Sequence, residues 1–373
     1  LFKQAKAGLS AGRAMHEVVL LTHAGQGPYD LLLVGGLSTP QGTTTPAADL
    51  GGPLPIFPAQ GVATAATVVL RYYPWTSPPQ VQEMSGSPQL KYRIQPTVAT
   101  LGSGETAIIG GVLGQSGGVV TTVNDFELLT SAGSTAHAGA YPLVRGRVGA
   151  VAAPLSTTQL LLFGGNLQST TAALSKEAVE TLTLGATPMA ALTSVEAAAM
   201  ALVSPVAHAT LSPYGKGQLL LAGGLTVEQG KATKVQTTRA LLRLSMVASK
   251  LRVAEITGSG FAPVAYHGAT PLPGGDLLIT GGMPATCPAG TPCASAAAYN
   301  FHATTEGVRT EPPMKWPRMG HRATRLADGA VLISGGLHHD GSRLLTHKSS
   351  ELYGPARVDP FNRKVAEMTR RCQ

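Results

Sequence analysis

Arginine recurs at one position of a repeated segment, and several cations placed in this way could bind an anion. This position holds Arg13, Arg93, Arg147 and Arg318 in four copies, and Val203 and Val264 in the other two. If the copies surround one axis, the guanidinium groups would form an electropositive channel mouth for a carboxylate, a phosphate or an acidic peptide. Alternatively, each arginine hydrogen-bonds the backbone or a carboxylate of the adjacent copy. Counting positions leaves both hypotheses open.

Histidine recurs three residues after the arginine position. This second position holds His16, Pro96, Ala150, Val206, His267 and His321. We expect these histidines to pack on the first strand of each copy rather than to share a ligand, because one residue per copy leaves them far apart on a ring. With the four arginines, His321 is kept as a candidate for binding a ligand or partner.

The remaining polar clusters indicate no catalytic residue, cofactor or metal site. The segment His338-His339-Asp340-Gly341, with His347, resembles a polar loop, because adjacent side chains on extended backbone point in different directions. Copper-radical chemistry would need paired Tyr and His ligands with a crosslinked Cys, and we find no such set. Ser-His-Asp, paired-carboxylate and HExxH patterns are not evident either. We therefore do not expect an enzyme, and a metal-dependent oxidase is the weakest alternative.

Two of the three cysteines flank a short loop. Cys287 and Cys293 enclose five residues that include two prolines and a glycine, and they could close a disulfide in an oxidising compartment. The alternative is a pair of free thiols. Cys372 is a free thiol or a link to a partner.

A recurring aliphatic run that ends in Gly-Gly predicts the fold. Successive second glycines are 75, 54, 59, 58 and 54 residues apart, close to the period of about 50 residues of a kelch-type propeller blade. We expect the glycines to be structural, since they permit close backbone approach or positive φ. They are Gly35 and Gly36, Gly110 and Gly111, Gly164 and Gly165, Gly223 and Gly224, Gly281 and Gly282, and Gly335 and Gly336.

Each repeat predicts four antiparallel strands, so the expected fold is all-β: a single six-bladed propeller over residues 1–373. The expected blades are 13–84, 93–141, 146–196, 203–256, 262–314 and 318–368, with an inserted loop at 37–64. The outer strand of the last blade could be Val365–Met368. Alternatively, Phe2 and Lys3 lie on that edge.

The last repeat carries a family resemblance. The pattern RxxHxAxxLxxGxxLIxGG over Arg318–Gly336, followed by ELYxP from Glu351, resembles the kelch repeat of bacterial galactose-oxidase-like propellers. The resemblance extends over the whole chain and implies a kelch propeller. Such propellers are chiefly interaction platforms, and a minority are enzymes such as copper radical oxidases and sialic-acid mutarotases.

Composition restricts the partners. Charged residues make up 13% of the chain, and its 28 Lys and Arg are scattered, so we do not expect nucleic-acid binding. No apolar run is long enough to span a membrane. The small, uncharged surface favours an extracytoplasmic protein, periplasmic, surface-exposed or secreted, with any signal peptide absent from this chain.

We therefore predict a non-catalytic interaction or structural module, a subunit of a larger extracytoplasmic assembly that binds other protein subunits. The loops after the Gly-Gly strands would bind the partner. The alternative is a carbohydrate-binding or sugar-mutarotase-like propeller that binds an acidic glycan at the arginine-lined channel mouth.

Overall fold

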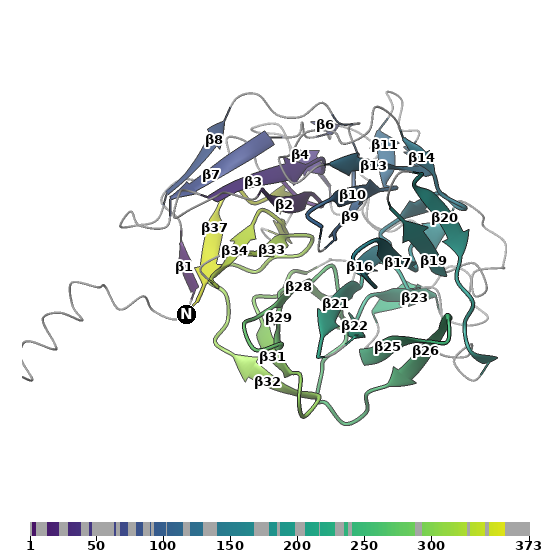
Figure 1. The fold of residues 1–373 in the computed structure, drawn as a ribbon. Coiled ribbons are helices and arrows are strands. Elements are labelled where there is room, and N and C mark those ends of the chain that lie inside the picture. Colours follow the sequence, from purple (N-terminus) through teal and green to yellow (C-terminus); the bar gives the residue numbers. More distant parts are fainter. Residues whose placement is uncertain are drawn as a thin grey trace, which may run out of the picture.

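In the computed structural model, the chain is an all-β propeller with no α-helix among the described residues (Figure 1). No described helix is long and apolar enough to cross a membrane. The structure describes residues 2–4, 13–21, 29–38, 45–46, 63–64, 68–73, 80–84, 90, 93–101, 103–114, 120–129, 140–167, 179–184, 187–197, 206–215, 217–227, 235–237, 241–287, 293–326, 329–339 and 343–354.

Five four-stranded antiparallel sheets follow one another along the chain. The first contains β2 (Glu17–Leu21), β3 (Tyr29–Val34), β7 (Val68–Tyr73) and β8 (Gln80–Met84). The second contains β9 (Thr97–Thr100), β10 (Thr106–Ile109), β13 (Asp125–Leu129) and β14 (Tyr141–Pro142). The third contains β16 (Val151–Pro154), β17 (Gln159–Phe163), β19 (Val179–Thr183) and β20 (Met189–Leu192). The fourth contains β21 (Thr210–Tyr214), β22 (Gln218–Ala222), β25 (Leu241–Val247) and β26 (Lys250–Glu255). The fifth contains β28 (Gly268–Pro271), β29 (Leu277–Thr280), β31 (Ala298–His302) and β32 (Gly307–Glu311).

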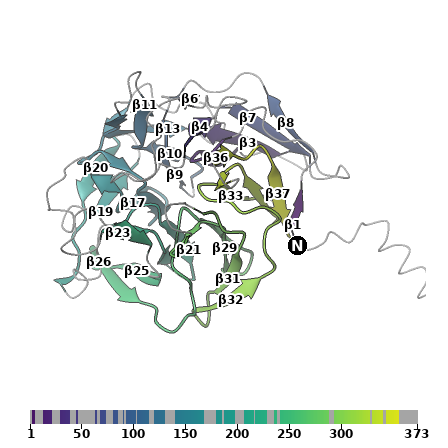
Figure 2. The same cartoon turned by 180° about the vertical axis from the view of Figure 1, so that it is seen from behind.

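A further four-stranded sheet joins the two ends of the described chain. It consists of β33 (Arg322–Arg325), β34 (Val331–Ser334), β37 (Ser350–Tyr353) and the N-terminal β1 (Phe2–Gln4). In the register of β1 and β37, Phe2 lies opposite Tyr353. Both views show β1 beside β37 (Figure 1, Figure 2). The outer edge is thus held by the N-terminal segment, the alternative that the sequence left open. Residues 365–368 lie outside the described residues.

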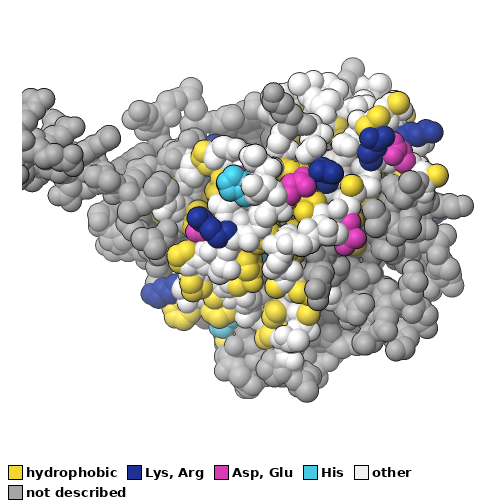
Figure 3. Space-filling model, turned by 90° about the horizontal axis from the view of Figure 1, so that it is seen from below, with side chains coloured by type: hydrophobic (Ala, Val, Ile, Leu, Met, Phe, Trp, Pro, Cys, Tyr) yellow, Lys and Arg dark blue, Asp and Glu magenta, His cyan; other side chains and the backbone are white. Residues whose placement is uncertain are grey.

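The innermost strands form a closed ring. Along it, β2 contacts β9, followed by β16, β21, β28 and β33, and β33 contacts β2. The second strand of each described sheet is buried on both faces between neighbouring sheets, which is why these strands read as continuous aliphatic runs. Charged side chains on the face in Figure 3 stand singly or beside a side chain of opposite sign. This agrees with the sparse, scattered charge of the sequence.

Short secondary sheets follow the Gly-Gly turns. They pair β4 (Leu37–Ser38) with β6 (Ala63–Thr64), β11 (Val112–Gly114) with β12 (Val120–Thr122), β15 (Arg147–Val148) with β18 (Asn166–Leu167), β23 (Leu225–Val227) with β24 (Val235–Thr237), and β27 (Val264–Ala265) with β30 (Met283–Pro284). After the sixth Gly-Gly pair, a separate three-stranded sheet pairs β35 (Leu337–His339) with β36 (Arg343–Thr346), which also pairs with β5 (Thr45–Pro46) of the predicted 37–64 insertion.

The Gly-Gly pairs connect each sheet to the next. The second glycine donates its N–H to a carbonyl at the arginine position of the following sheet: Gly36 to Arg93, Gly111 to Arg147, Gly165 to Val206, Gly224 to Val264, Gly282 to Arg318 and Gly336 to Arg13. The first glycine has a left-handed backbone conformation, and it lies so close to the backbone of the next sheet that a side chain would clash. At Gly281, φ is +60° and a Cβ would lie 2.5 Å from the Arg318 carbonyl oxygen. Both features exclude a side chain.

Candidate functional site

A ring of left-handed residues closes the axis of the propeller. It consists of the residues two positions after the arginine position: Met15, Gln95, Gly149, His208, Tyr266 and Gly320, with φ between 53° and 66°. Five neighbouring pairs are joined by backbone hydrogen bonds of 2.8–3.2 Å. Four of the six are not glycine, although side chains disfavour this conformation. Such strain is found at functional sites when the surrounding structure imposes it.

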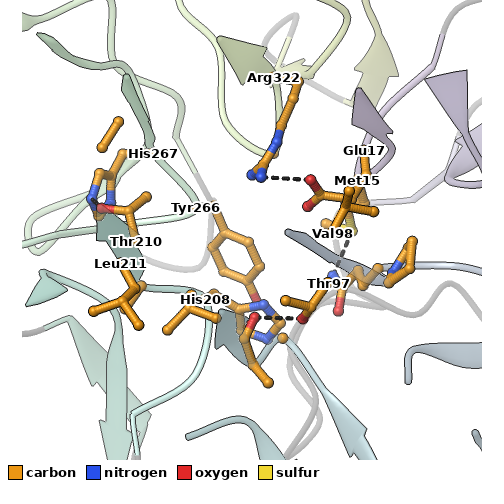
Figure 4. Close-up of a pocket in the computed structure, with 18 of the residues that line it drawn as sticks. Met15, Glu17, Thr97, Val98, His208, Thr210, Leu211, Tyr266, His267 and Arg322 are labelled. Atoms are coloured by element: carbon orange, nitrogen blue, oxygen red, sulfur yellow. Dashed lines mark hydrogen bonds and ion pairs between the residues drawn. The ribbon is translucent and has the colours of Figure 1, made fainter. Parts of the chain in front are cut away.

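A cavity of about 120 Å³ extends from this ring along the innermost strands (Figure 4). We call it the axial cavity. Five buried polar atoms of its lining residues have no hydrogen-bond partner among the described residues. These atoms are Nδ1 of His16, His267 and His321, Oε1 of Gln95 and the hydroxyl of Tyr266. A buried polar atom without a partner costs about 1–3 kcal/mol. Native proteins keep few such atoms, and five around one cavity indicate a site for a polar ligand.

The three cavity histidines connect adjacent sheets. The Nε2 atom of each histidine hydrogen-bonds a hydroxyl oxygen of the preceding sheet. The distances are 3.2 Å from His16 to Ser334, 2.8 Å from His267 to Thr210 and 2.9 Å from His321 to Thr280. Burial lowers the pKa of His267 to about 3 and lowers the pKa values of His16 and His321 well below the usual range. The imidazoles are therefore neutral near pH 7, and each offers Nδ1 as a donor or an acceptor.

One ion pair crosses the cavity wall where the first and last sheets meet. Arg322 Nη2 lies 2.5 Å from Glu17 Oε2, and both residues line the cavity. Burial raises the pKa of Glu17 to about 7, although the nearby Arg322 opposes this effect. Glu17 can therefore exchange a proton near neutral pH, and its protonation would weaken the ion pair with Arg322.

An aromatic pair forms another part of the wall. The rings of His208 and Tyr266 stack with centroids 4.2 Å apart. Burial lowers the pKa of His208 to about 3 and raises that of Tyr266 well above 10. The pair thus presents a neutral imidazole and a neutral phenol, which bind polar but uncharged groups by hydrogen bonding.

The four repeated arginines do not line the axial cavity. Arg93, Arg147 and Arg318 are 0–1% exposed, and each donates to the carbonyl of the first glycine 17 residues later. Their ion-pair partners are Asp125 and Glu127 for Arg93, Glu180 for Arg147 and Glu351 for Arg318. Arg13 donates to the Gly35 carbonyl. All these contacts lie within the arginine's own sheet, and not in the adjacent sheet, which was one of the two hypotheses from the sequence.

Most of the polar residues that line the axial cavity were not predicted from the sequence. Gln95, His208, Tyr266, Glu17 and Arg322 were not singled out, and only His321 was both proposed and found in the lining. In the fourth sheet the predicted register was wrong. Val206 was assigned to the histidine position. It occupies the arginine position instead, since its carbonyl accepts from Gly165, and Ala209 takes the histidine position. Aligning the residue two places after each arginine would have found the ring.

Comparison with known proteins shows the fold alone. No family model matches the chain, and no curated protein sequence matches it. The structure of YjhT is similar over 94% of this chain and 97% of that chain, with a TM-score of 0.60 and 12% sequence identity. In all, 285 solved chains match, and because one fold hosts many activities, the function must be argued from the site.

The remaining predicted clusters lie apart from the axial cavity. Cys287 and Cys293 form the predicted disulfide, with Cα atoms 5.5 Å apart. The rings of His338 and His347 stack at 4.1 Å, while the neighbouring residues 340–342 lie outside the described residues. Within the described part of the chain, no three His, Cys, Asp or Glu side chains are grouped as metal ligands would be.

Proposed function

We propose that this chain is a six-bladed kelch-type propeller whose axial cavity binds a small polar ligand of the carbohydrate class. The five unpartnered polar atoms around the axial cavity carry the proposal. A polyhydroxylated ligand suits them, because each hydroxyl both donates and accepts and can pair with an imidazole nitrogen, an amide oxygen or a phenol. The lining histidines are neutral, and Glu17 and Arg322 pair with each other. The cavity therefore favours a ligand with hydroxyl groups over a ligand with several charges.

The blade count in this proposal is supported by the closed ring of innermost strands. Five blades use consecutive strands, and the sixth would be the sheet of β33, β34, β37 and β1. The kelch assignment is supported by the Gly-Gly pairs and by the buried arginines bonded to the first glycine. The ligand would meet Arg322 rather than the four arginines first considered, since those are held by carboxylates and carbonyls.

Ligand-observed NMR with a panel of neutral and acidic monosaccharides tests this function. We expect at least one sugar to show saturation transfer that a Tyr266→Phe substitution weakens by about tenfold, a typical effect of losing one buried hydrogen bond. Tyr214→Phe serves as the matched control, because the Tyr214 hydroxyl already bonds Glu306 Oε1 at 2.8 Å. Transfer that is absent for every sugar, or equal in both variants, would refute the proposal.

A second candidate function, protein interaction, is favoured by exposed apolar side chains on the outer strand β20. Met189 is 57% exposed and Leu192 49% exposed. Large exposed apolar groups at a strand that ends a sheet suit a protein contact. Affinity purification with a Met189→Ser, Leu192→Ser variant tests it: a stoichiometric partner should be lost, and recovery of the same partner would contradict this candidate. An extracytoplasmic location also remains a proposal, supported by the disulfide.

A further inference from the structure

A second pocket, which shares no lining residue with the axial cavity, lies where the fifth sheet passes to the sixth. Its volume is about 590 Å³, within the usual range for small-ligand sites. It lies between the segment that precedes β33, the segment that precedes β37 and the end of the disulfide loop. The lining residues that matter here are Trp316, His347, Lys348, Ser349, Thr346 and Cys293. We call it the Trp316 pocket.

Trp316 is a large apolar side chain at the wall of this pocket, on an anchored backbone segment. The residue is 40% exposed. Its backbone N–H lies 3.3 Å from Glu351 Oε1, and the N–H of Lys315 donates to Glu351 Oε2 at 2.7 Å. Glu351 is itself buried and paired with Arg318. The buried ion pair thus anchors the backbone that carries the indole, so that little backbone entropy is lost when a ligand stacks on the ring.

The rest of the wall contains neutral hydrogen-bonding groups that are also bonded within the protein. His347 Nε2 lies 3.0 Å from the Pro317 carbonyl, and Ser349 Oγ lies 3.5 Å from His347 Nδ1. Burial lowers the pKa of His347 to about 3, so the ring is neutral at physiological pH. Cys293, which is disulfide-bonded to Cys287, lies at the other wall. The pocket therefore combines an aromatic platform with hydroxyl and imidazole groups.

The described charges at the pocket are positive. Lys348 is exposed and lines the pocket, and it makes no ion pair with any residue that the structure describes. Lys315 Nζ lies 5.4 Å from the centroid of the Trp316 ring. No described carboxylate lines the pocket. An anionic group is thus favoured beside the indole.

We propose that the Trp316 pocket binds a sugar ring of an acidic polysaccharide. The apolar face of a pyranose would stack on Trp316, its hydroxyls would meet Thr346 and Ser349, and its carboxylate would lie near Lys348. A peptide strand is disfavoured because the adjacent strand β36 is paired on both edges, by β35 and by β5, and offers no free edge for main-chain pairing. The proposal does not depend on the axial cavity.

The test uses tryptophan fluorescence, since the chain has two tryptophans, Trp75 and Trp316. In a Trp75→Phe background, we expect trigalacturonate to change the emission saturably, with Kd in the millimolar range, about 1 mM. Lys348→Gln should weaken binding about two- to fivefold, as for an exposed ion pair, and added salt should do the same. Lys250→Gln, at an exposed lysine of β26, should leave the affinity unchanged.

Three results would overturn the proposal: no emission change with trigalacturonate, equal binding of neutral maltotriose, or tighter binding of a tetraglutamate peptide. If Trp75→Phe does not fold, saturation-transfer NMR of the unaltered chain with the same three probes gives the same contrast. Tyr266→Phe separates the two sites, because it should weaken sugar binding at the axial cavity by about tenfold and leave trigalacturonate binding intact.

Discussion

Tyr266→Phe removes one hydroxyl from the axial cavity and keeps the ring. The hydroxyl is buried and has no hydrogen-bond partner among the described residues, while the ring stacks on His208. Because no described residue bonds this hydroxyl, its removal breaks no hydrogen bond among them and relieves a desolvation cost of about 1–3 kcal/mol. We expect the free energy of unfolding of the ligand-free protein to stay the same or to rise by roughly 1–2 kcal/mol.

The assay compares Tyr266→Phe with Tyr214→Phe by urea denaturation and thermal unfolding. Tyr214 is also mostly buried, but its hydroxyl donates to Glu306 at 2.8 Å, so its loss should lower the free energy of unfolding by about 0.5–1.5 kcal/mol. For a chain of 373 residues, the thermal midpoint should move by about 1–2 °C for each kcal/mol, downward for Tyr214→Phe and upward or not at all for Tyr266→Phe. Destabilisation of both variants by the same amount would refute the reasoning, because it would show that Tyr266 is bonded within the protein.

Other perturbations test the remaining steps. Glu17→Gln should flatten the pH dependence of stability. Because the pKa of Glu17 is raised from 4.5 to about 7 in the folded state, the free energy of unfolding should fall by up to about 3 kcal/mol as the pH rises from 4.5 to 7. The same fall in the variant would contradict this. Gly281→Ala should cost about 2–4 kcal/mol in denaturant titrations, against about 1 kcal/mol for Gly258→Ala, whose φ is also positive but whose Cβ meets nothing; equal losses would exclude the proposed clash. Arg147→Met should cost about 3–5 kcal/mol because it leaves Glu180 buried and unpaired, and adding Glu180→Leu should restore part of the loss; no recovery would show that the pair does not act as a unit.

The propeller was predictable because its constraints repeat. A Gly-Gly pair is required wherever one sheet bonds to the next, so it appears six times with a similar spacing. The aliphatic run before it is equally obligatory, since the second strand of each sheet is buried on both faces. The N-terminal strand β1 was only one of two options, because three residues carry too little pattern to choose a partner strand.

The axial cavity was harder to predict, for a physical reason. The ring position holds Met, Gln, Gly, His, Tyr and Gly, so its left-handed backbone leaves no common residue type. The surrounding hydrogen bonds impose the conformation, and local propensity contributes little. Glu17 and Arg322 are 305 positions apart in sequence and meet only where the ring closes. The repeated arginines form a strong sequence pattern, but the reason for it is structural: each arginine bonds to strands and turns of its own sheet.

The decisive measurement is a high-resolution crystal structure of the protein grown with the best-binding sugar of the panel. The proposed function predicts that the sugar lies in the axial cavity, with hydroxyls within hydrogen-bond distance of the Tyr266 hydroxyl and Gln95 Oε1. A sugar bound only elsewhere, with the axial cavity holding water molecules that satisfy these same atoms, would contradict it.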